Sequence, residues 1–232
     1  MRDELGDKIK SNFEDALRIQ LPRRTHVVIR IDGRRFHTFT KRLERPYDER
    51  LAQALDTAAL ALAAEMSGCR LGFGQSDEYS FLLTDFGSEH EKMWFDGNVQ
   101  KITSVAASIF TAHFTQAFSL ATFDARVMVI PRRADVIDYF IWRQLDASAN
   151  SLNMLASAHY SHEELLGRST AEKHDLLHAK GLNWAQEKTS FKRGRVICPA
   201  IRPAGTGFVL DLEPPVFPRA PEYLAGLIPE GA

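Results

Sequence analysis

The chain has 232 residues, with 29 lysines and arginines against 30 aspartates and glutamates, and a formal net charge of −1. A hydrophobic share of 44% and a charged share of 25% are typical of a globular protein and exclude a wholly disordered one. The near-neutral charge argues against an indiscriminate binder of polyanions, and no apolar stretch reaches the ~18–20 residues that span a membrane. The N-terminal residues contain no apolar signal core, and the two cysteines have no zinc-ligand spacing, so we expect a cytoplasmic protein.

The first predicted element is an amphipathic helix over residues 3–20, where apolar side chains recur at every fourth position, at Leu5, Ile9, Phe13 and Leu17. Residues 26–31 are a β-branched run of strand length that ends at Asp32-Gly33. After a break at residues 45–48, Asp48 is a suitable N-cap for a helix that ends at Gly68.

A hairpin is predicted next, with strands over residues 71–75 and 79–83 and a turn at Ser76-Asp77-Glu78. Residues 97–118 have helical spacing, and residues 123–130 alternate as a strand does. The order strand, helix, strand, strand, helix, strand predicts an α/β (α+β) fold of the ferredoxin-like βαββαβ type. In that fold the first and third strands lie side by side at the centre of a four-stranded antiparallel sheet.

The C-terminal half is predicted to be mainly helical. Residues 135–156 have helical spacing, and a capping box at Ser169-Thr-Ala-Glu172 begins a helix that ends near Gly181. A last short strand is expected from Val196. Six of the ten prolines lie after residue 202, so this segment is expected to be an irregular tail. The three tryptophans, Trp94, Trp142 and Trp184, are expected to pack in the core.

Two carboxylates are the strongest chemical signal in the chain. Asp32 follows the first strand and Asp77 lies in the turn that leads into its predicted neighbour, so the fold brings them to one sheet edge. Mg²⁺ takes oxygen ligands, often one or two carboxylates with phosphates and waters, and two such ions about 3.5–4 Å apart can clamp a phosphoryl transfer. Gly33 would let the backbone approach closely, and Glu78 would add charge or orient a water. The alternative is that Asp-Gly and the polar hairpin are ordinary turns.

Basic residues cluster in two runs. Residues 30–45 hold six basic and two acidic side chains, a net +4, and residues 187–195 hold four and one, a net +3. Such runs suit triphosphates or an RNA backbone, or they are solvated loops. Phe36 and His37 beside the first run are candidates for stacking on a base, although an aromatic residue next to a strand is more often part of the core.

Four segments resemble the tRNA-His guanylyltransferase family and its bacterial and archaeal guanylyltransferase-like branch: RIDGRRFHTF (30–39), GQSDEYSF (74–81), FDARV (123–127) and DYFIWRQLD (138–146). The resemblance covers roughly residues 9–200. It implies a polymerase-type palm that adds nucleotides to the 5′ end of tRNA in the 3′–5′ direction. ATP or GTP activates the 5′ end, the 3′-hydroxyl of an incoming nucleotide attacks it, and two Mg²⁺ ions serve both steps. The implied segments are an N-terminal helix (1–25), the palm-like catalytic core (26–131), a helical extension that completes the site (132–201) and a proline-rich tail (202–232).

The resemblance and the basic runs together assign roles to individual residues. Asp32, Asp77 and Glu78 are the predicted catalytic residues, and Asp32, Gly33 and Asp77 are the predicted metal ligands. The predicted nucleotide-binding residues are Gly33, Arg34, Arg35, Phe36, His37, Arg45, Asp48, Ser76, Lys101, Lys173 and Asn183. The predicted RNA-binding residues are Arg126, Arg132, Arg133, Asn150, Lys192 and Arg193. The resemblance implies that the partners are tRNA and nucleoside triphosphates. It also implies that the protein is a homotetramer and that it does not bind a membrane.

One departure from the family pattern separates two versions of this activity. The eukaryotic enzymes carry His-Ile-Asn-Asn where this chain has Ser148-Ala-Asn-Ser151, and only Asn150 is kept. This favours templated repair of 5′-truncated tRNA over strict addition of G to tRNA-His. Two further readings use the same fold: a palm-type nucleotide cyclase, and a non-catalytic RNA-binding sheet, although the aromatic motifs of an RNA-recognition sheet do not appear.

Overall fold

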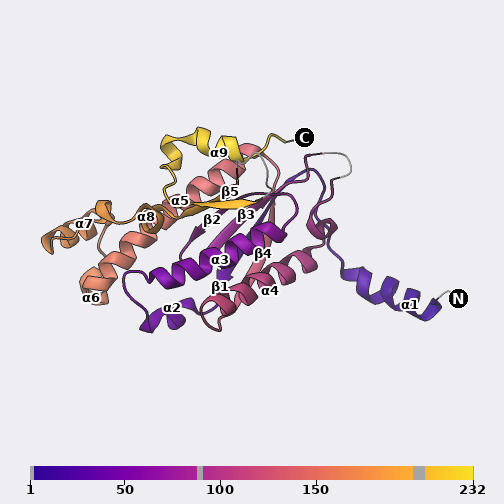
Figure 1. Ribbon diagram of the computed structural model, residues 1–232, viewed down its shortest axis with the longest axis horizontal. Coiled ribbons are helices and arrows are strands. Elements are labelled where there is room, and N and C mark those ends of the chain that lie inside the picture. The colour runs from indigo at the N-terminus through magenta and orange to yellow at the C-terminus, as the bar shows by residue number, and fades with distance from the viewer. Residues whose placement is uncertain (1–2, 88–90, 201–206, 232) are drawn as a thin grey trace.

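The computed structural model describes residues 3–87, 91–200 and 207–231, which are built around one antiparallel sheet (Figure 1). The sheet has six strands in the order β4–β1–β3–β2–β5–β6. The helices α3 and α4 pack on one face, and α5 with the C-terminal segment packs on the other. Within the described residues, no helix has both the length and the apolar character to cross a bilayer.

The central four strands and two helices follow the predicted βαββαβ order. Their bounds are β1 (His26–Gly33), α3 (Glu49–Glu65), β2 (Cys69–Gln75), β3 (Glu78–Leu83), α4 (Val99–Ala117) and β4 (Phe123–Ile130). β1 lies between β3 and β4, with Ile31 opposite Tyr79 on one side and Asp32 opposite Asp124 on the other. The predicted fold class is therefore confirmed, including the central position of the first and third strands.

The remaining elements surround this unit. The helices are α1 (Glu4–Ile9), α2 (Phe36–Phe39), α5 (Arg133–His159), α6 (His162–Leu165), α7 (Thr170–Ala179), α8 (Thr189–Arg193) and α9 (Pro221–Leu227). The short helical turns are η1 (Lys10–Glu14), η2 (Asp15–Leu17), η3 (Thr40–Arg42), η4 (Trp94–Gly97), η5 (Trp184–Gln186) and η6 (Phe217–Arg219). Two more strands, β5 (Arg195–Pro199) and β6 (Phe208–Asp211), extend the sheet beyond β2.

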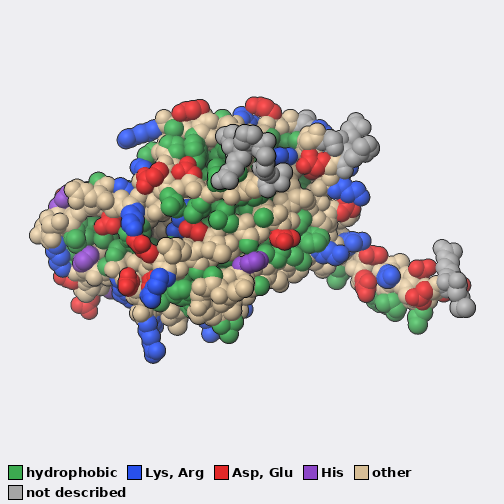
Figure 2. All heavy atoms as spheres, in the orientation of Figure 1, with side chains coloured by type: hydrophobic (Ala, Val, Ile, Leu, Met, Phe, Trp, Pro, Cys, Tyr) green, Lys and Arg blue, Asp and Glu red, His purple; other side chains and the backbone are tan. Residues whose placement is uncertain are grey.

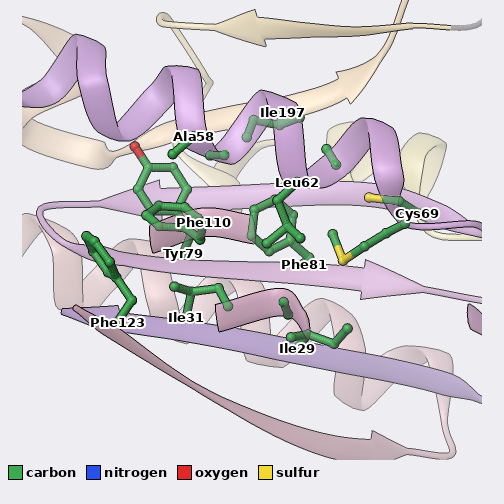
Figure 3. Close-up of a cluster of buried hydrophobic side chains, with 14 of the residues drawn as sticks. Ile29, Ile31, Ala58, Leu62, Cys69, Tyr79, Phe81, Phe110, Phe123 and Ile197 are labelled. Carbon is green, nitrogen blue, oxygen red and sulfur yellow. The ribbon is translucent and has the colours of Figure 1, made fainter. Parts of the chain in front are cut away.

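Alternation along the strands divides the core into two layers. Ile29 and Ile31 of β1 point to the face covered by α3 and α4, where they join Phe81, Phe110 and other buried side chains (Figure 3). Val28 points to the opposite face and packs in the cluster that contains α5 and α9. Because side chains alternate, Arg30 and Asp32 share the face of Val28, on the α5 side of the sheet.

The N-terminal segment is helical as predicted, but its apolar stripe is not buried. α1, η1 and η2 project from the body of the molecule, and hydrophobic side chains line the lower edge of this arm in Figure 2. Leu5, Phe13 and Leu17 are each more than half exposed. The periodicity therefore predicted the helix correctly, although the stripe is not packed against any other part of the described chain.

The prediction of an irregular tail after residue 202 is wrong for the described part of that segment. Residues 208–211 form β6, and Phe217, Leu224 and Ile228 are buried between α5 and the sheet. The prolines are compatible with this structure because Pro218 lies in the first turn of η6 and Pro221 at the first position of α9, where no helical N–H bond is lost. Pro203 lies outside the described residues.

Replacing Phe217 with Ala should lower the free energy of unfolding by about 3–5 kcal/mol, because the change leaves a cavity in the second core layer. The ring is fully buried, stacks on Tyr223 and meets the edge of Phe73. Urea unfolding followed by circular dichroism measures the effect. The half-exposed Leu212 in the same segment is the control, and Leu212→Ala should cost less than about 1 kcal/mol. Equal losses in the two variants would show that the segment does not pack as described.

Candidate active site

Asp32 and Asp77 lie beside Gly33, at the end of β1 and in the β2–β3 turn. A Cβ at position 33 would lie 2.6 Å from Oδ2 of Asp77 and 2.3 Å from the ring of Phe36. No side chain larger than hydrogen fits between these groups. The glycine therefore allows the Asp77 carboxylate to rest directly against the end of β1, which is the close approach that the sequence predicts.

The β2–β3 turn holds Asp77 in place. Ser76 adopts a left-handed backbone conformation, with φ 54°, and its Oγ donates a hydrogen bond of 3.0 Å to Oδ1 of Asp77. Burial raises the pKa of Asp77, and the negative charge of Asp32 raises it further, while the Ser76 hydroxyl opposes both. A buried carboxylate whose pKa is raised in part by a neighbouring carboxylate belongs to a site that a cation would stabilise.

Two arginine side chains also contact Asp32. Nη2 of Arg126 on β4 lies 3.4 Å from Oδ2 of Asp32 and 3.5 Å from Oδ1 of Asp124, and Nη2 of Arg30 lies 3.8 Å from the same Asp32 oxygen. Arg126, predicted to bind RNA, is thus brought beside the candidate metal ligands. Its side chain is 55% exposed, so it can also contact a phosphate that approaches the site.

Glu78 forms ion pairs with two arginines. Its Oε1 pairs with Nη2 of Arg143 at 2.5 Å, and its Oε2 pairs with Arg30. Burial raises the pKa of Glu78, whereas Arg143 and Arg30 lower it. Because each carboxylate oxygen already has a guanidinium partner, Glu78 is not free to orient a water as predicted. Arg143, on α5, has a side chain only 5% exposed and was not among the predicted site residues, although it lies in one of the segments that carry the family resemblance.

A polar cavity of about 380 Å³ opens at these carboxylates. Asp32, Asp77 and Glu78 line one side, and Asn150 and Asn153 of α5 line the other. Nζ of Lys173 on α7 donates a 2.9 Å hydrogen bond to Oδ1 of Asn153 and so reaches the rim. The catalytic core and the helical extension therefore both contribute to the cavity.

A second cavity of about 440 Å³ lies on the other side of the β2–β3 turn. The two cavities share Gln75, Ser76, Met154 and Ser157 as a common wall. The second is mainly apolar, with its rim formed by His37, Arg45, Asp48 and Lys188 and its inner surface by Leu43, Pro46, Leu51, Leu55 and Phe191. Its lining suits a partly apolar ligand next to the carboxylates.

Below this second cavity lies a buried charged group that sequence reasoning did not find. Tyr79 donates a 2.6 Å hydrogen bond to Oδ1 of Asp56, Arg195 donates a 2.9 Å hydrogen bond to the Tyr79 hydroxyl, and Nε of Arg195 lies 2.8 Å from Oδ1 of Asp56. The three residues come from α3, β3 and β5, which are remote in sequence. Neither spacing nor composition could have brought them together.

Two predicted nucleotide-binding residues cap helices. Asp48 accepts hydrogen bonds from the backbone N–H groups of Arg50 and Leu51 and forms an ion pair with the Arg50 side chain. The hydrogen bonds from Arg50 are the main reason that its pKa falls to about 2. Asn183 accepts from the N–H of Ala185 at the start of η5. The prediction of Asp48 as an N-cap is confirmed.

The cap at Asp48 predicts a defined acid dependence of stability. A carboxyl whose pKa is depressed by folding stabilises the protein above its unfolded pKa of about 3.9 and loses that contribution as the pH falls towards the folded value of about 2. Asp48→Asn keeps a good cap but cannot ionise. We therefore expect the wild-type advantage in urea unfolding to be constant above pH 5 and to shrink between pH 4 and pH 2. A difference independent of pH would contradict this.

Other predicted nucleotide contacts are not placed at the site. The ring of Phe36 is 5% exposed and packs against Phe39, Phe114 and Phe123, which contradicts stacking on a base. Arg34 and Arg35 are exposed and border neither cavity. Lys101 lies in the first turn of α4, roughly 15 Å along the helix from Thr111, whose hydroxyl contacts the start of β4 beside Gly33. Phe36, Arg34 and Arg35 differ from the prediction because neighbours in sequence point to different faces, and Lys101 differs because it lies at the end of α4 away from the site.

Most of the predicted RNA contacts have structural partners. Arg133 donates to the carbonyl oxygens of Ala225 and Ile228 and thereby anchors α9, while Arg132 forms two 2.7 Å hydrogen bonds with Asp135. Both follow the end of β4 that pairs with His26, at the opposite end of β1 from Asp32. They are therefore remote from the candidate site.

The second basic run is largely internal. Lys192 is buried, donates to the carbonyl oxygen of Ala185 and lies 5.6 Å from the ring centre of Trp184. Burial, with help from the neighbouring Arg193, lowers its pKa. Arg193 is half-buried and donates to Oγ1 of Thr189. The run is not a surface patch because α8 packs on α5 and β5 joins the sheet.

The donor set at the carboxylates suits a hard cation. Among the described residues, no three His, Cys, Asp or Glu side chains form a ready metal cluster. A closed zinc-type site is therefore not formed by this part of the chain. Mg²⁺ needs only one or two carboxylates and takes its other ligands from waters and substrate phosphates. Asp32 and Asp77, joined across Gly33, fit that requirement.

Comparison with known proteins places these features in a family. Residues 6–131 match the sequence profile described as tRNAHis guanylyltransferase. The tRNA(His) guanylyltransferase of Schizosaccharomyces pombe is 32% identical over 214 residues, covering 81% of this chain and 80% of that protein. A bacterial tRNA(His) guanylyltransferase (Thg1)-like protein has been solved in complex with ATP, with a TM-score of 0.90 and 38% identity over 97% of this chain and 99% of that chain. A structure of a bacterial tRNA(His) guanylyltransferase (Thg1)-like protein in complex with GTP gives a TM-score of 0.86, with the same 38% identity and the same coverage of both chains.

Proposed function

The chain belongs to the tRNA-His guanylyltransferase family, whose members are nucleotidyltransferases, and we propose that it adds nucleotides to the 5′ end of tRNA in the 3′–5′ direction. In the proposed sequence the 5′-phosphate of the tRNA attacks the α-phosphate of ATP or GTP and displaces pyrophosphate. The 3′-hydroxyl of an incoming nucleoside triphosphate then attacks the activated 5′-phosphate and displaces the nucleoside monophosphate. The observation that carries the proposal is the meeting of Asp32 and Asp77 across Gly33 in a polar cavity that adjoins a second, mainly apolar one.

Asp32 and Asp77 would hold two Mg²⁺ ions together with the Gly33 carbonyl. When bound, Mg²⁺ would polarise the phosphoryl oxygens and neutralise charge on the leaving group. The protein supplies the fixed arrangement: Ser76 orients Asp77, and Arg143 and Arg30 hold Glu78 beside the pair. Arg126 would be released from Asp32 towards a substrate phosphate once the carboxylate charge is neutralised.

The nucleotide would occupy both cavities. The apolar cavity would receive the base, with His37, Arg45 and Lys188 at its rim, and the triphosphate would extend past Ser76 to the carboxylates. Lys173 and Asn150 stand on the far side of the polar cavity, where they would approach the phosphates or the RNA. The ATP and GTP complexes of the similar bacterial protein support nucleotide binding in this fold.

We further propose templated repair of 5′-truncated tRNA as the version of the activity. The eukaryotic His-Ile-Asn-Asn segment is replaced by residues 148–151, where Ser151 is fully buried and receives a 3.0 Å hydrogen bond from Nε1 of Trp184. A serine that is fully buried and hydrogen-bonded internally is not available to contact a tRNA. The high similarity to the bacterial protein, 38% over 97% of the chain, also supports this branch.

The test is incubation with Mg²⁺, a labelled nucleoside triphosphate and tRNA transcripts of two kinds. Label should enter the 5′ end of a tRNA that lacks its first nucleotide, in the order dictated by the opposite strand, and should disappear with EDTA. Addition only to full-length tRNA-His without its −1 guanosine would instead support strict guanylyl transfer. A cyclic nucleotide without tRNA labelling, or tRNA binding without chemistry, would replace the proposal with a cyclase or a silent binder. Light scattering of the same sample would test the proposed homotetramer.

A further inference from the structure

Trp142 on α5 is a large aromatic residue that the core does not use. Its indole is 51% exposed, contrary to the sequence prediction, whereas Trp94 is buried. An exposed tryptophan is common enough to need no explanation by itself. Its neighbours distinguish it, because they connect it directly to the candidate active site.

The indole is held in a fixed orientation. Cζ of Arg143 lies 4.6 Å from the ring centre, a cation–π distance, and the ring of Tyr139 meets it edge-on at 5.9 Å. The Tyr139 hydroxyl is itself 2.8 Å from Oγ of Ser80 on β3. Two buried or half-buried neighbours thus fix part of the ring, and about half of it remains exposed to solvent.

A short series of contacts leads from this ring to the candidate metal ligands. Arg143 pairs with Glu78, Glu78 pairs with Arg30, and Nη2 of Arg30 lies 3.8 Å from Oδ2 of Asp32. Trp142 is therefore separated from Asp32 by one arginine, one glutamate and a second arginine.

The sheet beside α5 is polar at this point. Arg126 lies opposite Arg30, and Asp124 lies opposite Asp32, on the same face of the sheet as α5. Asp146 and Asn150 follow Trp142 on α5 at helical spacing, and Asn150 lines the polar cavity. The exposed indole therefore borders a polar surface that leads to the carboxylates and includes the exposed cation of Arg126.

We propose that the exposed face of Trp142 is a stacking platform for the terminal base of the RNA whose 5′ end is extended, with Arg126 contacting the adjoining phosphate. This inference rests on the proposed function, because it supposes an RNA end at the carboxylates. Aromatic side chains stack on bases without regard to sequence, which suits an enzyme that must hold the end of a helix whatever its last base pair is. Rigidity matters here, since a ring already fixed by Arg143 and Tyr139 loses little entropy on stacking.

Two readouts test this platform. In EDTA, without nucleotide, a tRNA transcript lacking its first nucleotide should quench the intrinsic tryptophan fluorescence of the wild type, and most of the quenching should be absent from Trp142→Phe. In the addition assay, Trp142→Leu should raise KM for the tRNA about tenfold with kcat changed less than about threefold, and Trp142→Phe should restore a KM within about threefold of the wild type. Leu145→Ala removes another exposed apolar side chain one turn away and should change neither.

The outcomes separate this inference from the proposed function. Quenching that depends on Trp142 in a protein that adds no nucleotide would support the platform and reject the proposed reaction. Equal quenching in wild type and Trp142→Phe, or an unchanged KM in Trp142→Leu while addition proceeds, would overturn the platform and leave the reaction standing. A blue shift of Trp142 emission on raising the protein concentration without RNA would indicate a contact between copies and would also overturn it.

Discussion

Replacing Asp77 with Asn should lower kcat/KM for nucleotide addition by at least about 1,000-fold. The amide keeps the size of the side chain and can still accept from Ser76, but it removes one of the two negative charges that would hold the metal ions. Stability should change little or increase, because burial and the nearby Asp32 already disfavour the charged form of Asp77. The measurement is single-turnover addition to truncated tRNA at saturating Mg²⁺, with thermal unfolding of both proteins.

Asp124 provides a matched control for this prediction. It lies directly opposite Asp32 on β4 and pairs with the same Arg126, but its side chain is 51% exposed. Asp124→Asn should therefore remove an equal charge from the same surface and reduce the rate less than about threefold, whereas Asp32→Asn should match Asp77→Asn. Similar losses at all three positions would show that overall charge, and not metal coordination, controls the reaction.

The order of strands and helices was accessible from sequence because each central element has a strong local pattern. The β-branched run before Asp32 and the alternation over residues 123–130 are typical of strands, and Asp48 caps the helix between them. The C-terminal segment lacked such a pattern, since proline content obscured three apolar residues that pack against α5. Its burial depends on a surface that the rest of the chain must first form.

The site was predictable only where one short segment carries the chemistry. Asp32 lies at the end of β1 and Asp77 lies in the turn between β2 and β3, so the strand order alone places them together. Side-chain partners were not predictable in this way. Glu78 pairs with Arg143, which lies on a helix 65 positions later in the chain. In the second basic run, Lys192 and Arg195 form hydrogen bonds inside the protein. A charge run shows its sign in the sequence but not its partners.

The buried group of Asp56, Tyr79 and Arg195 gives a further large predicted effect on stability. Arg195→Met should lower the free energy of unfolding by about 3–5 kcal/mol, because it leaves the Asp56 carboxylate under the second cavity without its cation. Burial already raises the pKa of Asp56, and Arg195 is the main group that opposes this rise. Urea unfolding monitored by circular dichroism at several pH values measures the loss.

The pH dependence separates loss of the cation from loss of packing. Without Arg195 the pKa of Asp56 in the folded protein rises further above its unfolded value of about 3.9. The free energy of unfolding of the variant therefore falls progressively as the pH rises through and above that value. The deficit relative to wild type should therefore be larger at pH 8 than at pH 5. Adding Asp56→Asn to Arg195→Met should remove the pH dependence and recover part of the stability, because no uncompensated charge remains. A deficit that is the same at both pH values, and unchanged in the double variant, would mean that Arg195 contributes through its volume and not its charge.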